Sequence, residues 1–141
     1  MKLVRTLPVY PMFGRGRTRL QPVHVDDVAE AITRILDGSG GADRPCYELG
    51  GPRTYTYQEL LQSIAQAMGT RVRTVPMPFA AWQALALVAE FLPGAPLTRN
   101  QVALMQHDNI ASDDLPGLLE LSITPTALET VVPEIAGRER G

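Results

Sequence analysis

Apolar and polar residues in the segment 22–35 follow two successive periods. An apolar extended run, residues 22–25, passes directly into a stretch with helical spacing, which predicts a strand that feeds a helix. One face of this helix is apolar and the other is mostly charged; the apolar positions are Val28, Ala29, Ala31, Ile32 and Ile35. We expect the carboxylates of Asp26 and Asp27 to cap the first-turn N–H groups and to complement the helix dipole.

Two further short strands are expected, one on each side of a helix. Residues 46–49 (CYEL) and residues 71–75 (RVRTV) alternate between apolar and polar positions, and each run stops at a glycine or a proline. The apolar surroundings of Cys46 predict a buried thiol. Residues 9–19 and 38–45, by contrast, are rich in turn and loop formers.

Capping signals predict where the remaining helices begin. Capping boxes at residues 56–59 and 98–101 should each open a helix. A helix that is apolar on nearly all sides is expected from Pro78 to Leu92. The last helix should begin at Thr124-Pro125, with an overlapping start one turn later.

Length and composition favour one small globular domain. The chain has 141 residues, of which 45% are hydrophobic and 20% are charged, an ordinary globular composition. We expect a single lobe over residues 1–136 and a disordered tail over residues 137–141. The single cysteine excludes an internal disulfide, and the lack of a signal-peptide core after Met1 favours a reducing, cytoplasmic setting.

The formal net charge of −2 conceals a segregation of charge along the chain. The first twenty residues contain five basic residues and no acidic residue, whereas the rest contains eight basic and fifteen acidic residues. We therefore expect a positive patch near the N-terminal end. Nucleic acid is a poor candidate partner, because most of the chain is acidic.

The segment VHVDDVAEAI, preceded by the turn FGRG at residues 13–16, resembles the C-terminal, substrate-side half of extended short-chain dehydrogenases. The segments CYELGGP, YTYQELLQSIAQAMG, RVRTVPMP and PLTRNQVALMQHDN are similar to the same half. They look most like the atypical branch that contains the dehydrogenase-like accessory subunit of respiratory complex I. The resemblance covers nearly the whole chain. It implies an α/β fold, the C-terminal lobe of an extended Rossmann-type protein, with short strands, about five helices and no N-terminal dinucleotide-binding half.

Two features of the family's chemistry are missing from this sequence. A dinucleotide site needs a glycine-rich turn between a strand and a helix, and no GxGxxG or GxxGxxG occurs among the twelve glycines. The family's catalytic pair is a tyrosine with a lysine four residues later, and the only lysine here is Lys2. We therefore expect no catalytic residue, no cofactor site and no activity in the isolated chain. The resemblance implies NAD(P) for a full-length relative.

Two functions of different classes follow from the resemblance. The first is the substrate-binding cap of an NAD(P)-dependent epimerase- or dehydratase-like protein, which would act on a small carbonyl or hydroxyl substrate once a Rossmann half is present. The alternative is a non-catalytic interaction or assembly protein related to the complex I accessory subunit. Because strands of a parallel sheet would lack neighbours here, we expect the partner to be a second copy or a missing Rossmann half.

Five residues are candidates for substrate binding: Arg15, Arg17, Arg19, His24 and Trp82. The alternating arginines could clamp a pyrophosphate bidentately or form only a solvated loop. His24 could bind a phosphate or an acidic substrate, or could be a structural histidine. Trp82 lies on a helix that is too short to cross a bilayer. This helix could be buried in the core, line a site for an apolar ligand or make a peripheral membrane contact. Two histidines and one cysteine provide no ligand set for a metal.

Overall fold

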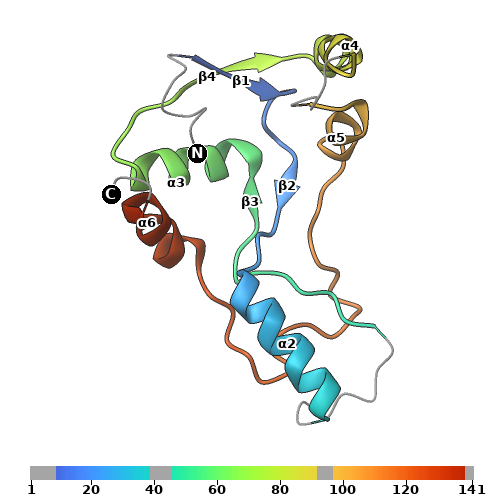
Figure 1. The fold of residues 1–141 in the computed structure, drawn as a ribbon, viewed down its shortest axis with the longest axis vertical. Coiled ribbons are helices and arrows are strands. Elements are labelled where there is room, and N and C mark those ends of the chain that lie inside the picture. Colours follow the sequence, from blue (N-terminus) through green and yellow to red (C-terminus); the bar gives the residue numbers. More distant parts are fainter. Residues whose placement is uncertain (1–8, 39–45, 92–96, 139–141) are drawn as a thin grey trace. The chain divides into compact units, whose positions relative to one another are not determined.

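The computed structural model describes residues 9–38, 46–91 and 97–138 (Figure 1). Contacts group the chain into two compact units: unit 1 is Met1–Arg19 with Tyr55–Asp108, and unit 2 is Leu20–Thr54 with Asn109–Gly141. The described residues form a mixed α/β fold with five helices and two small two-stranded sheets. The α/β class and the short strands are therefore confirmed. The single lobe over residues 1–136 stays a prediction.

The sheet of unit 1 is a pair of parallel strands, β1 (Val9–Phe13) and β4 (Arg73–Met77). Val9 lies opposite Arg73 and Phe13 lies opposite Met77, so the strands end together. The sequence analysis did not predict β1, because residues 9–19 are rich in turn formers. Pairing with a strand some sixty residues away outweighs this local preference for a turn. A second pair, β2 (Arg19–Leu20) with β3 (Tyr55–Thr56), is only two residues long.

Both predicted capping boxes are present in unit 1. The Thr56 hydroxyl accepts a hydrogen bond from the backbone N–H of Glu59, whose carboxylate accepts one from the Thr56 N–H. Thr98 and Gln101 make the same reciprocal pair. The apolar helix begins directly after Pro78, as expected, while Leu92 lies outside the described residues. The helices of unit 1 are α3 (Tyr57–Ala67), α4 (Phe79–Ala89) and α5 (Arg99–Leu104).

Unit 2 contains α2 (Val25–Asp37) and α6 (Leu128–Arg138). Its core packs α2 against the turn at residues 118–123; the buried members are Ala31, Leu118, Leu121 and Ile123. Arg34 fastens the same contact, since its Nη1 donates to the carbonyl oxygens of Leu121 and Ser122 at 2.7 and 2.8 Å. α6 reaches two residues into the expected tail, and residues 139–141 lie outside the described part.

Several sequence-based expectations for unit 2 are wrong. Residues 22–25 form no strand, and residues 46–49 do not either. Among the described residues, the segment 46–49 has a single backbone hydrogen bond, from Glu48 N–H to the Pro116 carbonyl at 3.0 Å. Without a neighbouring strand the alternation at residues 46–49 has nothing to pack against, and Cys46 is exposed rather than buried. Ala29 and Ile32 point outward although the pattern placed them on the inner face.

Candidate functional site

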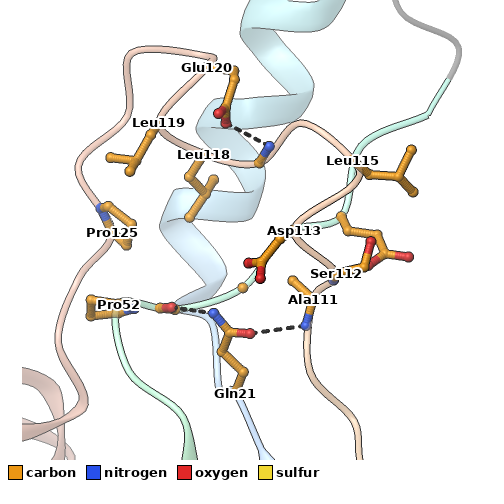
Figure 2. A pocket seen from close by; sticks show the side chains of 14 residues that line it. Gln21, Pro52, Ala111, Ser112, Asp113, Leu115, Leu118, Leu119, Glu120 and Pro125 are labelled. Carbon is orange, nitrogen blue, oxygen red and sulfur yellow. Dashed lines mark hydrogen bonds between the residues drawn. The ribbon is translucent and has the colours of Figure 1, made fainter.

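Unit 2 contains a pocket of about 330 Å³ (Figure 2). Three separate segments form it: the residue that follows β2, the turn at residues 48–52, and the long loop that precedes α6. Sequence analysis did not predict this pocket, because no local pattern links residues as far apart in the chain as Gln21 and Pro125. Its lining residues are Gln21, Glu48, Gly50, Gly51, Pro52, Ala111, Ser112, Asp113, Leu115, Gly117, Leu118, Leu119, Glu120 and Pro125.

The side-chain amide of Gln21 holds two of these segments together. Its Nε2 donates to the Gly51 carbonyl oxygen at 2.8 Å, and its Oε1 accepts from the Ala111 N–H at 2.9 Å (Figure 2). The neighbouring glycines allow this close approach. A Cβ on Gly50 would collide with the Gln21 amide, and a Cβ on Gly51 would collide with the Pro22 carbonyl oxygen. The Gly-Gly-Pro run was the one sequence signal for this wall of the pocket.

Three carboxylates give the pocket its electrostatic character. Glu48 accepts a hydrogen bond from the Ser112 N–H at 2.6 Å, and Glu120 accepts one from the Gly117 N–H at 2.8 Å. Figure 2 shows the Asp113 carboxylate directed toward the space between Leu118 and Gln21. Among the residues that the structure describes, no arginine or lysine lines the pocket. Such a lining suits a ligand that donates hydrogen bonds, such as a hydroxyl or ammonium group, and disfavours a phosphate.

His24 has a structural role at the start of α2. It is the N-cap residue, and its Nδ1 accepts from the backbone N–H of Asp26 at 3.4 Å. The expected cap by Asp26 and Asp27 is therefore wrong, although both carboxylates lie in the first turn, where they complement the helix dipole. Asp27 instead turns inward and accepts from the N–H and hydroxyl of Thr126, each at 2.7 Å.

The three arginines of the turn after β1 differ in their surroundings. Arg19 is committed to Asp108, because its Nε lies 2.8 Å from Oδ2 and its backbone N–H donates to Oδ1 at 2.7 Å. The Arg19 backbone hydrogen bond, and then its side chain, lower the pKa of the Asp108 carboxyl. Arg15 and Arg17 are exposed and make no ion pair with any described residue. All three residues belong to unit 1, whereas His24 belongs to unit 2.

Trp82 lies in the core of unit 1. Its ring stacks on Phe13 with centroids 4.4 Å apart, and its Nε1 donates to the Met12 carbonyl oxygen at 3.1 Å. Ala86 and Val102 complete the buried cluster around it. As placed, the indole satisfies its polar atom within the fold and fills the space between α4 and β1.

A part-buried tyrosine pair lies beside this cluster. The hydroxyls of Tyr10 and Tyr57 are 3.4 Å apart, and the Phe13 ring meets Tyr57 edge-on. Burial raises the pKa of Tyr57, and the hydrogen bond with Tyr10 adds to the shift. Tyr57 is therefore a neutral hydrogen-bonding group over the physiological range and is unsuited to act as a base.

Comparison with known proteins shows the relationship of the chain. No protein-family model matches it. It is 31% identical over 128 residues to the Arabidopsis thaliana protein "NADH dehydrogenase (ubiquinone) 1 alpha subcomplex subunit 9, mitochondrial", a match that covers 84% of this chain and 32% of that protein. The Mus musculus protein of the same name is 26% identical over 132 residues, covering 92% of this chain and 35% of that protein. A solved structure described as "Crystal structure of gox2253" covers 98% of this chain and 41% of its own, with a TM-score of 0.57 and 26% identity.

These matches show that the chain, which has an α/β fold, is similar in sequence to NADH dehydrogenase subunits. The particular relatives are subunit 9 of the alpha subcomplex, so the resemblance to the complex I accessory subunit is confirmed. The chain spans about a third of the length of these relatives. They are mitochondrial by name, which does not support the expected cytoplasmic setting. Within the described ranges, no helix combines the length and apolar character needed to span a membrane.

Proposed function

We propose that the chain is part of a non-catalytic accessory protein that helps to assemble or stabilise a multi-subunit NADH dehydrogenase. The observation that carries this proposal is the similarity to subunit 9, which extends over 84% of the chain in one relative and 92% in another. On this proposal the protein would act where its complex resides, and its main partners would be other subunits.

The substrate-cap function is the second candidate, and the pocket of unit 2 is the observation that favours it. Its volume of about 330 Å³ is in the range of small-molecule sites. The carboxylates of Glu48, Asp113 and Glu120 would suit a small hydroxylated substrate. In either case, NAD(P) would be held by a part of the full-length protein other than this chain, and the pocket would not supply the hydride.

Native gel electrophoresis of the full-length protein in its own organism separates the two candidates. A chromosomally tagged protein should migrate with the NADH dehydrogenase, as detected by in-gel NADH oxidation, and deletion of its gene should lower the amount of assembled complex. The control is a strain that lacks a catalytic subunit, in which the tagged protein should move to a smaller species. Migration at its own mass, with an undiminished complex after deletion, would contradict the assembly function. NAD(P)H-dependent turnover of a carbonyl substrate by the purified protein would then favour the cap.

A further inference from the structure

The turn that follows β1 has a firmly held backbone. Gly14 N–H donates to the Met77 carbonyl at 2.9 Å, and the Gly16 carbonyl accepts from Gln58 N–H at 3.1 Å. The Thr18 hydroxyl donates to the Met105 carbonyl at 2.6 Å. Gly14 and Gly16 have φ values of +55° and +68°, which favour glycine at both positions. The turn therefore presents the side chains between these anchors with little backbone freedom left to lose on binding.

The two arginines on this turn are surplus positive charges in unit 1. Among the described residues of unit 1 there are only three carboxylates, and each already has a partner. Glu59 closes a capping box, Glu90 pairs with Arg99, and Asp108 pairs with Arg19. Arg15 and Arg17 are exposed and have no ion-pair partner in this part of the chain. Their charge is available to an anion from outside the unit.

The position of the turn matches that of known anion sites. It follows the carboxyl end of β1 and touches the carboxyl end of β4 through the bond between Gly14 and Met77. Ligands of parallel sheets bind outside the carboxyl ends of the strands. The first residue of α4, Phe79, packs against Gly14, and the N-cap residue Pro78 provides no side-chain acceptor for the helix N–H groups. The positive end of α4 therefore lies uncapped beside the turn, and it adds to the attraction for an anion.

We propose that Arg15 and Arg17 form a binding site for a phosphate group at the carboxyl ends of β1 and β4. Of the three arginines that were candidates from the sequence, the site excludes Arg19, because Asp108 already pairs with it. Two guanidinium groups on a fixed turn can each donate two parallel hydrogen bonds to phosphate oxygens. The phosphate can belong to a soluble phosphoester or to an anionic lipid headgroup. The inference concerns a binding site, and it does not depend on the assembly function.

The test uses the full-length protein with two probes, inorganic pyrophosphate and vesicles of phosphatidylcholine with or without 30% phosphatidylglycerol. Binding is measured by thermal shift and calorimetry for pyrophosphate and by flotation for vesicles. The variant R15A/R17A removes the site. The matched control is R71A/R73A, which removes two exposed arginines of unit 1 with the same spacing from the opposite end of β4. R15K/R17K keeps the charge but loses the bidentate geometry, and it also checks that the turn still folds.

We expect R15A/R17A to weaken binding of one probe at least tenfold, R15K/R17K to weaken it less, and R71A/R73A to leave it within twofold of the parent. Loss of pyrophosphate binding identifies a soluble phosphoester as the source, and loss of vesicle binding alone identifies a lipid headgroup. Equal losses in R15A/R17A and R71A/R73A would show only general electrostatic attraction, which overturns the proposal. Failure of the parent to bind either probe, or unchanged binding in R15A/R17A, overturns it as well.

Discussion

The Asp27 carboxylate ties the start of α2 to the segment before α6, and its removal tests what holds unit 2 together. Asp27 is 7% exposed and accepts two hydrogen bonds of 2.7 Å from Thr126, one from the backbone N–H and one from the hydroxyl. It is the one charged residue that is buried among those described. The change to examine is Asp27→Ala, which removes the acceptor and leaves both Thr126 donors without it.

We expect Asp27→Ala to lower the free energy of unfolding by about 2–4 kcal/mol. A hydrogen bond to a charged group contributes roughly 1.5–3 kcal/mol, and the two bonds add incompletely because they share one carboxylate. The alanine variant also avoids the cost of burying a charge, which offsets part of the loss. Thr126→Val removes only the hydroxyl and should produce about half of the effect, roughly 1–2 kcal/mol on the same scale.

Urea unfolding followed by far-ultraviolet circular dichroism measures this difference. With a slope of about 1–3 kcal/mol per molar urea, a loss near 3 kcal/mol moves the midpoint by roughly 1–3 M. Asp26→Ala is the matched control, because Asp26 is the adjacent carboxylate in the same helical turn and its side chain is 85% exposed. Its removal should cost no more than about 1 kcal/mol, the contribution of a surface charge to a helix dipole.

Equal midpoints and slopes for Asp27→Ala and Asp26→Ala would refute the reasoning, because burial and the Thr126 contacts would then make no difference. A double-mutant cycle with Thr126→Val provides a second check. The coupling free energy between positions 27 and 126 should be about 1 kcal/mol or more, as for residues that share a hydrogen bond. A coupling near zero would locate the effect elsewhere.

Three further predictions concern titration, packing and cofactor binding. Burial raises the pKa of Tyr57, so its contribution to stability should be complete below about pH 10, the ordinary tyrosine pKa, and be lost as the pH rises beyond it. Tyr57→Phe should therefore flatten the alkaline limb of the pH–stability curve, and an unaltered limb would contradict this. Gly51→Ala should lower the free energy of unfolding in urea by at least about 1–3 kcal/mol, because the added methyl group collides with the Pro22 carbonyl oxygen. Gly117→Ala is the control and should cost less, because its methyl group would lie 3.3 Å from its nearest atom, the Glu48 carbonyl oxygen. The isolated chain should show no saturable NAD(P)H binding tighter than about 100 μM in calorimetry, about −5.5 kcal/mol, and a tighter isotherm would disprove the expectation.

The sequence alone determined those features of the protein that arise within a few residues. The capping boxes at Thr56 and Thr98 and the start of α4 after Pro78 are all as expected. Gly69, two residues after the end of α3, has the left-handed backbone conformation (φ +67°) that is common where a helix stops. Each depends only on residues less than one helical turn apart, so neighbouring sequence contains all the necessary information. The resemblance to the complex I accessory subunit could also be recognised from the sequence, because it depends on the order of such segments along the chain.

Only the tertiary structure decided features that join distant segments. β1 exists because it pairs with β4, and residues 46–49 are no strand because no described strand pairs with them. From the sequence, the Asp27 side chain could cap its own helix or point inward. It points inward because it accepts hydrogen bonds from Thr126, 99 residues away. Arg19 likewise leaves the arginine cluster by pairing with Asp108, 89 residues away. The local sequence determines which hydrogen-bond donors and acceptors a residue has. The partner of each group depends on which segments the fold brings within hydrogen-bonding distance.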